Sequence, residues 1–567
     1  MSHLVCHPTP GLRRDSFLSL DGVWAVSQNG ASPVSITVPY PPESSLSGAK
    51  SPPVGRASLH YRKAFSLPAG FLTGGRLLLH IGAADQYLEV RLNGTLVPTT
   101  KGESVAVGAY RANVYDLTEA ILPDEENLLE VAVTDNLRDG VIPYGKQRVK
   151  RGGMWYTPIS GIWQSVWLEA VPEVYVRALR VDSQIAPDRA SALVRITAEG
   201  VDGGTVHITT PDGMLDIPLS GGVAEAVISN PRLWSPDAPY LYEFTVEAGE
   251  VGGTRDRVAS YFALRTLTVE TVGGIPRLCL NGRPYFFHAL LDQGYFPEGI
   301  LTPDAPDAYE RDIQVARSLG FNTLRKHIKV EPERFYYDCD RLGMLVFQDM
   351  VNNGRYSFLR DTALPTVGLK SRSDKRMHPN KAARAAFLAA MEATVEALRH
   401  HPCICLWTIF NEGWGQFDSE AVYRGLRELD STRFIDTASG WFKGGESDVD
   451  SEHIYFKPVS LRFGSRPMIL SEFGGYACRI EGHAPAASYG YRFFDSPAAL
   501  EDAIIRLYEE EILPAIPHGL CAAVYTQLTD VEDEVNGLIT YDREAIKVDA
   551  ERMRELAMRL EAAMGQA

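Results

Sequence analysis

The chain has 567 residues, of which 45% are hydrophobic and 23% charged, and its formal net charge is -16. This length exceeds what one hydrophobic core normally supports, so several domains are expected. The acidic balance disfavours nucleic acid and anionic membranes as partners, and no apolar stretch reaches the roughly 18 to 20 residues of a membrane span. These bounds predict a soluble multidomain protein.

The N-terminus and the cysteines indicate the compartment. The start "MSHLVCHPTPGLRRDSF" carries its charged pair after the apolar patch and lacks a continuous apolar core, so no secretory signal is predicted. The cysteines are odd in number and form no CxxC pair, which argues against a disulfide framework and a zinc site. We expect a cytoplasmic protein with reduced thiols, no metal and no cofactor, and we leave homo-oligomer formation open. The seven cysteines are Cys6, Cys279, Cys339, Cys403, Cys405, Cys478 and Cys521.

Short alternating strands fill the first half of the chain. From Leu20 to about Glu169, runs such as "RLLLHIG" and "LLEVAVTDN" are separated by Gly, Pro, Asn and Asp, a pattern typical of a β-sandwich. A second set from about Val174 to Val269 has the spacing of an immunoglobulin-like sandwich. We predict a jelly-roll-like β-sandwich over residues 1–172 and an immunoglobulin-like β-sandwich over residues 173–269.

The pattern changes after "PRLCLNGRPYFFHALLD", because amphipathic helical stretches such as Ala308 to Leu319 and Ala382 to His400 now alternate with apolar strands. Eight candidate strands suit a (β/α)₈ TIM barrel, which we predict over residues 270–567. Active sites of such barrels lie at the carboxyl ends of the strands. The candidates are Tyr285 to Leu291, Asn322 to His327, Leu345 to Met350, Ile404 to Glu412, Phe434 to Ser439, His453 to Phe456, Met468 to Glu472 and Ala522 to Leu528.

Two glutamates end predicted barrel strands. Glu412 closes the fourth strand in "LWTIFNEGWGQF", and Glu472 closes the seventh in "MILSEFGGY". Hydrolysis of a glycosidic bond needs one acid to protonate the leaving oxygen and one carboxylate to meet the sugar carbon. Either residue taken alone could be an acid favoured at a helix start. Two glutamates at apolar strand ends of one barrel favour chemistry.

Three ordered motifs, "GGMWYTPISGIWQSVWLE", "HPCICLWTIFNEGWG" and "ILSEFGGYA", resemble glycoside hydrolase family 2, the family of β-galactosidases, β-glucuronidases and β-mannosidases. The resemblance covers nearly the whole chain and implies that residues 1–172 form a sandwich of the sugar-binding type. It implies a retaining, exo-acting β-glycosidase with Glu412 as acid/base and Glu472 as nucleophile. It further implies that Asn411 contacts the sugar 2-hydroxyl and that Tyr455 hydrogen-bonds the nucleophile.

Other polar and aromatic residues near the predicted strand ends are candidates for sugar binding. The polar ones could bind hydroxyls or simply face solvent in loops. Trp414, like Trp407, could wall the acid/base, and Trp441 could stack on a sugar face or pack in the core. The polar candidates are His288, Asp292 and Gln293 on strand one and Gln527 and Asp530 on strand eight.

A basic cluster in "TLRKHIKVEP" bears on specificity. Arg325, Lys326, His327 and Lys329 could grip a carboxylate such as that of a hexuronic acid, or could form ion pairs with barrel acids such as Asp349. On the first interpretation, replacing Arg325 or Lys326 by Met lowers the hydrolysis of uronides selectively. The family pattern at this strand is Arg, two spacers and His, whereas His327 follows Arg325 after one spacer.

The chain also lacks the Asn-x-Lys motif of β-glucuronidases. The leading interpretation is therefore a β-hexuronidase of the β-galacturonidase type, with β-glucuronides also considered. The runner-up is a β-galactosidase acting on neutral sugars. A non-catalytic carbohydrate-binding protein is the alternative from another class, although such a protein would be expected to have lost Glu412 or Glu472.

Overall fold

The computed structural model describes residues 7–50, 53, 55–137, 140–249, 255–366, 374–485 and 487–565. Within these ranges six cysteines are buried and free, as expected of reduced thiols. Cys6 lies outside the described residues. No helix in these ranges is both long and apolar enough to cross a membrane.

The first sandwich encloses its own core between two antiparallel sheets. The smaller sheet has the order β1-β13-β5-β10, and the larger has the order β3-β2-β4-β11-β7-β8 with β9 paired to β7. Burial alternates along β4 because successive side chains of a strand point to opposite faces. The strands are β1 Phe17–Ser19, β2 Gly22–Gln28, β3 Val34–Val38, β4 Ala57–Phe65, β5 Arg76–Ile81, β7 Tyr87–Leu92, β8 Thr95–Val97, β9 Ala106–Val107, β10 Asn113–Asp116, β11 Asn127–Asp135 and β13 Val166–Val171, and β6 Ala84–Asp85 pairs separately with β12 Gly161–Ile162.

The second sandwich is a single antiparallel sheet of order β14-β15-β18-β17-β16-β19-β20 that folds over on itself. The fold occurs at the β17–β18 hairpin, where only Ser220 and Val223 pair across the strands. Buried apolar residues from both halves meet in one core. The strands are β14 Ala178–Ile185, β15 Ser191–Glu199, β16 Gly203–Thr210, β17 Gly213–Ser220, β18 Val223–Ser229, β19 Tyr242–Ala248 and β20 Asp256–Phe262.

An eight-stranded parallel sheet forms the barrel, as predicted, in the order β28-β27-β26-β25-β24-β33-β30-β29. The three-stranded sheet β21 Leu267–Val272, β22 Ile275–Leu280 and β23 Arg283–Pro284 precedes it. Nearly all side chains of the barrel strands are buried, because helices and the barrel interior cover both faces. The strands are β24 Phe287–Asp292, β25 Thr323–Lys326, β26 Leu345–Asp349, β27 Ile404–Asn411, β28 Phe434–Ser439, β29 Asp450–Ile454, β30 Met468–Gly474 and β33 Leu520–Thr526.

The barrel helices follow most of the strands. Helix α4 begins where the Asn380 side chain accepts hydrogen bonds from two backbone N–H groups of the first turn. The connections 440–449 and 455–467, before and after β29, contain no helix. The other elements are α1 Ala308–Ser318, α2 Glu333–Leu342, α3 Leu364–Thr366, α4 Lys381–Leu398, α5 Ser419–Leu429, α6 Pro497–Leu507 and α7 Ala550–Gly565, with the short strands β31 Tyr476–Cys478 and β32 Arg492–Phe494.

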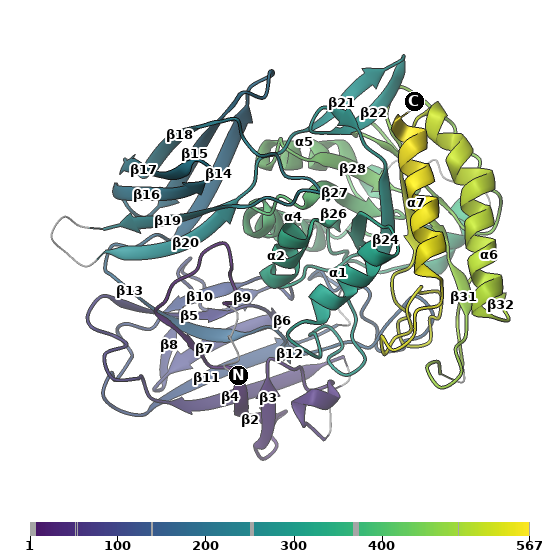
Figure 1. Ribbon diagram of the computed structural model, residues 1–567. Coiled ribbons are helices and arrows are strands. Elements are labelled where there is room, and N and C mark those ends of the chain that lie inside the picture. Colours follow the sequence, from purple (N-terminus) through teal and green to yellow (C-terminus); the bar gives the residue numbers. More distant parts are fainter. Residues whose placement is uncertain are drawn as a thin grey trace.

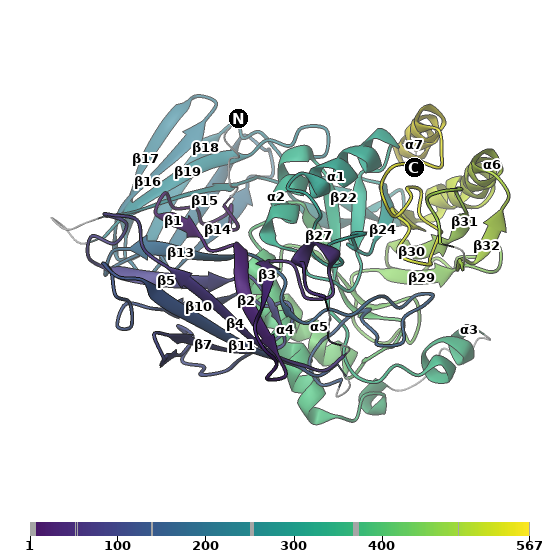
Figure 2. The ribbon, with the colours of Figure 1, turned by 90° about the horizontal axis from the view of Figure 1, so that it is seen from below.

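Both sandwiches lie on one side of the barrel, and helices α6 and α7 lie on the opposite side (Figure 1). The view from below shows the same arrangement, with the purple strands of the first sandwich beside the green barrel elements (Figure 2). The first sandwich is therefore placed to contribute residues to the barrel rim.

Candidate active site

Glu412 follows the last residue of β27 and turns into the barrel mouth. Its backbone is left-handed, with φ 55°, a conformation that costs energy in a residue with a side chain and is common at functional sites. The backbone is held by two hydrogen bonds, from the Glu412 N–H to the Ser439 carbonyl at 3.0 Å and from Trp441 Nε1 to the Glu412 carbonyl at 2.9 Å. Burial raises the pKa of Glu412 to about 7, against the opposing charges of Lys146 and Arg325.

Glu472 lies near the carboxyl end of β30. Tyr455 donates its hydroxyl to Glu472 Oε2 at 2.5 Å, and Arg325 Nη1 donates to Oε1 at 3.2 Å. The Tyr455 ring stacks on Tyr491 at 4.3 Å between centroids, which fixes the phenol. Charged and phenolic donors hold the carboxylate in one orientation.

The two acids lie close together and His453 bridges them. A side-chain oxygen of each acid and a His453 nitrogen all lie within 4.8 Å of one another. His453 Nδ1 is hydrogen-bonded with Glu412 Oε1 at 2.9 Å and lies 3.5 Å from Glu472 Oε2. Burial lowers the pKa of His453 to about 3, so the ring is neutral at physiological pH.

His453 was missed as a site residue because the predicted sixth strand began at this position. Strand β29 instead begins at Asp450, three residues earlier, so His453 lies near its carboxyl end. The polar residues 450–452 ("DSE") do not look like the start of a buried strand. Ser451 is nevertheless buried, and its hydroxyl donates a hydrogen bond to Asp436 Oδ1 at 3.0 Å. Had the strand been predicted to end at Ile454, His453 would have been a candidate site residue near its carboxyl end.

Arg325 and Asn411 form one hydrogen-bonded unit beneath the acids. Arg325 Nε donates to Asp349 Oδ1 at 3.0 Å, and Nη2 donates to Asn411 Oδ1 at 2.8 Å. The Asn411 oxygen is therefore occupied by the arginine. Its NH₂ group is the part of the amide left to meet a substrate oxygen.

Arg325 and Lys326 were expected to bind a substrate carboxylate, but both cations are paired with carboxylates of the protein. Lys326 Nζ donates to Asp292 Oδ2 at 2.5 Å and to Glu331 Oε1 at 2.9 Å, and both cations are 1% exposed. The positive charge of each residue is therefore already balanced, because a buried cation requires carboxylate partners within the protein. The alternative interpretation, ion pairing with barrel acids, describes both residues. Lys329 is likewise paired with Glu331.

Replacing Arg325 by Met should therefore lower kcat/KM on every glycoside in parallel rather than on uronides alone. The change leaves the buried carboxylates of Asp349 and Glu472 without their cation, and we expect the free energy of unfolding to fall by about 3–5 kcal/mol. Urea denaturation and the uronide-to-galactoside ratio of kcat/KM measure the two effects. A loss of kcat/KM on uronides alone would instead support the binding of a substrate carboxylate by Arg325.

His327 reaches the acids in spite of its departure from the family spacing. Its Nδ1 is hydrogen-bonded with Asp349 Oδ2 at 2.7 Å, and its Nε2 lies 3.9 Å from Glu472 Oε1. Strand β25 ends at Lys326, so His327 belongs to the turn that follows and does not obey strand alternation. The left-handed Ile328, with φ 54°, continues that turn.

The predicted hydroxyl binders on strands one and eight are bound to protein groups. His288 lies at the second residue of β24, far from the carboxyl end, and its nitrogens are hydrogen-bonded with Gly320 O at 3.0 Å and Tyr508 OH at 3.1 Å. This placement corrects the expectation for His288. Gln527 is paired with Gln293 and Asn536, Asp530 with Lys547, and Asp292 with Lys326. These hydrogen bonds and ion pairs hold the four side chains at the rim.

Trp414 and Trp441 form hydrogen bonds with backbone carbonyls at the barrel rim. Trp414 Nε1 donates to the Gly354 carbonyl at 3.1 Å, and Trp441 is 7% exposed and lies in a T-shaped arrangement with the His453 ring at 5.6 Å between centroids. Trp441 therefore packs and holds the Glu412 backbone instead of offering an open face. Trp407 donates to Asp430 and is fully buried, so it does not wall the acid/base.

A segment of the first sandwich, residues 144–157, docks on the barrel rim and was not predicted as part of the site. The Tyr144 and Gly145 N–H groups both donate to the Asn352 carbonyl, at 3.1 and 3.2 Å. Trp155 packs edge-on against Trp414 at 5.2 Å between ring centroids. Farther along, Tyr156 donates its hydroxyl to Glu534. These contacts bring the segment, which we call the docking segment, next to the acids.

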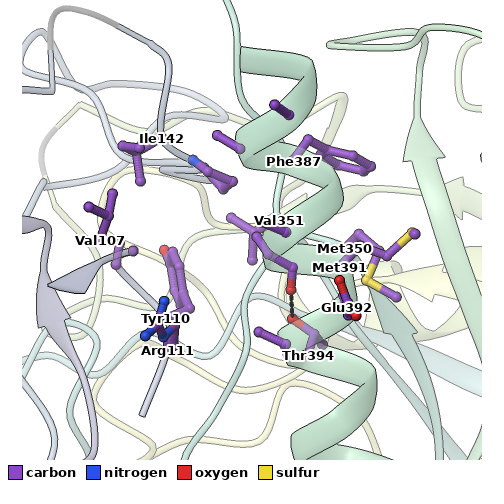
Figure 3. A pocket seen from close by; sticks show the side chains of 18 of the residues that line it. Val107, Tyr110, Arg111, Ile142, Met350, Val351, Phe387, Met391, Glu392 and Thr394 are labelled. Carbon is purple, nitrogen blue, oxygen red and sulfur yellow. Dashed lines mark hydrogen bonds between the residues drawn. The ribbon is translucent and has the colours of Figure 1, made fainter. Parts of the chain in front are cut away.

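A cavity of about 550 Å³ lies elsewhere between the first sandwich and α4 (Figure 3). Neither acid and none of the predicted sugar-binding residues contributes to its lining. It is therefore not the place where the acids act. Its mainly apolar walls include Val107, Tyr110, Ile142, Val351, Phe387 and Met391.

Comparison with known proteins gives two matching family models. The model described as "Glycosyl hydrolases family 2, TIM barrel domain" matches residues 304–457, and "Glycosyl hydrolases family 2" matches residues 174–265. The β-galactosidase of Lactococcus lactis subsp. lactis is 23% identical over 416 residues, which are 72% of this chain and 37% of that protein. The β-glucuronidase of Paenibacillus borealis is 21% identical over 438 residues, 71% of this chain and 67% of that protein. The chain spans less than half the length of the β-galactosidases it matches.

Solved structures match along the whole chain. A β-D-glucuronidase of Dictyoglomus thermophilum has a TM-score of 0.74 at 19% identity and covers 97% of this chain and 98% of its own. A family 2 β-galacturonidase of Eisenbergiella tayi, bound to galacturonate, has a TM-score of 0.66 at 18% identity and covers 96% and 97%. At these identities the likeness shows the shared fold.

Proposed function

Because the chain belongs to family 2 of the glycosyl hydrolases, we propose that it is a retaining, exo-acting β-glycoside hydrolase in which Glu412 and Glu472 are the reacting acids. The main support for this proposal is that side-chain oxygens of the two acids lie within 4.8 Å of each other. Retaining enzymes hold their carboxyl groups about 5–5.5 Å apart, whereas inverting enzymes need about 6.5–9.5 Å to admit a water molecule.

The different surroundings of the acids support different roles. Glu412, with its raised pKa, keeps a proton near neutral pH and donates it to the glycosidic oxygen. Glu472, oriented by Tyr455 and Arg325, attacks the anomeric carbon and forms the glycosyl-enzyme. Glu412 then accepts a proton from the water that hydrolyses this intermediate. We assign to the Asn411 NH₂ the hydrogen bond to the sugar 2-hydroxyl, because its oxygen already accepts from Arg325.

The rate on substrates with poor leaving groups should fall as the pH rises above about 7, the pKa to which burial raises Glu412. The sign follows from the need for a protonated acid, and the alkaline limb of kcat/KM reports that group in the free enzyme. An ordinary glutamate would lose its proton between pH 4 and 5. A pH profile on an alkyl glycoside measures the limb, and an undiminished rate at pH 9 would remove Glu412 from this role.

For the substrate, we propose a terminal β-hexuronide, either a β-galacturonide or a β-glucuronide, ahead of a neutral β-galactoside. Glucuronides and galacturonides are the substrates named for the similar solved structures, which match this chain over nearly its whole length, whereas the similar β-galactosidases are more than twice as long as their matched regions. The test is a panel of nitrophenyl β-glycosides containing both uronides and the galactoside, with proton NMR of the first product to establish retention. Inversion at the anomeric carbon would overturn the mechanism without touching the substrate class.

A non-catalytic carbohydrate-binding protein remains the alternative from another class. The short distance between the acids and their separate hydrogen-bond partners argue against it, because simple sugar binding requires neither a paired acid nor a raised pKa. Absence of turnover on the whole panel, with sugar binding intact, would favour this alternative.

A further inference from the structure

We propose that Lys146, carried by the docking segment of the first sandwich, binds the carboxylate of the hexuronide. The inference rests on the proposed function and assigns the substrate's anionic group to a residue outside the barrel. Lys146 is 9% exposed, and its ammonium makes no hydrogen bond or ion pair with any described residue. It is also not among the fully enclosed polar atoms without a partner, so Nζ reaches accessible space.

The backbone around Lys146 is fixed on both sides. The Gly145 N–H donates to Asn352 on the barrel rim, and the Lys146 carbonyl accepts from the Tyr156 N–H at 3.1 Å. The next residue, Gln147, donates to Asp85 at 3.2 Å and accepts from the Ile159 N–H at 2.7 Å. A lysine held in this way loses little further freedom when it binds an anion.

Contacts of the neighbouring residues place Lys146 at the barrel rim beside the turn that carries His327. Gly145 lies so close to the barrel that a side-chain carbon there would sit 2.8 Å from the Ile328 carbonyl, next to His327. The charge of Lys146 acts on three groups in the segments that follow three different barrel strands: Glu412, His327 and Glu534. The ammonium therefore lies within electrostatic reach of the acid/base.

The charge balance of the site explains why an anion is needed there. Arg325 is already paired with Asp349 and Glu472. Burial raises the pKa of Glu412 to about 7, so this acid does not provide a full counter-charge in the resting enzyme, and the Glu534 carboxylate is hydrogen-bonded to Tyr156 and Asn536. A largely buried ammonium without a partner is costly, and a substrate carboxylate supplies the missing one. A neutral sugar leaves the cation unpaired.

The test compares Lys146→Met with the wild-type enzyme on nitrophenyl β-uronides and on the matching β-galactoside. We expect kcat/KM on the better uronide to fall about 30-fold or more, and kcat/KM on the galactoside to change by less than about threefold. Lys146→Arg should recover part of the uronide activity because it retains the charge. Lys150→Met is the matched control, since Lys150 is exposed on the same segment.

A binding measurement makes the result independent of turnover. D-Galacturonate and D-glucuronate should raise the melting temperature of the wild type and Lys150→Met more than that of Lys146→Met, while galactose should not distinguish them. Equal losses on uronide and galactoside, or equal thermal shifts in all variants, would overturn the assignment of Lys146. Absence of any hydrolysis by the wild type, with the uronate shifts intact, would instead overturn the proposed hydrolase.

Discussion

Replacing Glu472 by Gln is expected to abolish glycosyl transfer, with kcat falling by about 10⁵-fold or more on every substrate. The amide keeps the shape of the side chain and can still accept from Tyr455, but it cannot form the glycosyl ester. The loss should not depend on the leaving group, because the covalent intermediate no longer forms. Steady-state kinetics and intact-protein mass spectrometry with a 2-fluoro glycoside measure the two consequences.

A melting curve provides the control, since Glu472 also pairs with the buried Arg325. A folded but inactive variant isolates the chemical role. Retention of labelling by the 2-fluoro glycoside in Glu472→Gln would contradict the assignment of this residue as nucleophile.

Replacing Glu412 by Ala should give a different loss, one that depends on the leaving group. The acid normally protonates the departing oxygen, so alkyl glycosides should slow by about 10²- to 10⁴-fold, whereas dinitrophenyl glycosides should retain rapid glycosylation. Removal of the side chain also opens space for a small anion beside the anomeric carbon. Azide should therefore accelerate turnover of dinitrophenyl glycosides and yield the β-glycosyl azide.

Glu412→Gln is the matched variant, because it removes the acid without opening space and should respond less to azide. Equal, azide-insensitive losses in Glu412→Ala and Glu472→Gln would contradict the roles given to both, because a nucleophile and a proton donor should not respond alike.

The barrel and the positions of the two acids were predictable because they depend on local patterns. An apolar run such as Ile404 to Phe410 is buried whatever its neighbours are, and its end sets where Glu412 lies. All eight candidate strands of the barrel are present, with shifted ends for several. Hydrophobic burial is nearly independent of the partner residue, so composition and spacing carry it.

Pairing between charges was not predictable in the same way. The cluster Arg325, Lys326, His327 looked equally suited to a ligand and to protein acids, and only distances to Asp349, Asp292 and Glu331 decided the matter. Electrostatic energies change steeply with separation and burial, and neither quantity is written in a short motif.

The sequence by itself therefore determined the resemblance to family 2 of the glycosyl hydrolases, the barrel and the two carboxylates at its rim, because each follows from a contiguous stretch of chain. Only the tertiary structure decided that His453 bridges the acids, that Arg325 and Lys326 are paired with carboxylates, and that Lys146 of the first sandwich is buried without an ion pair to any described residue. Lys146 and Glu412 are far apart in the chain, and the docking of one domain on another brings them within electrostatic reach of each other. No local pattern encodes that proximity, because it depends on how two separately folded cores fit together.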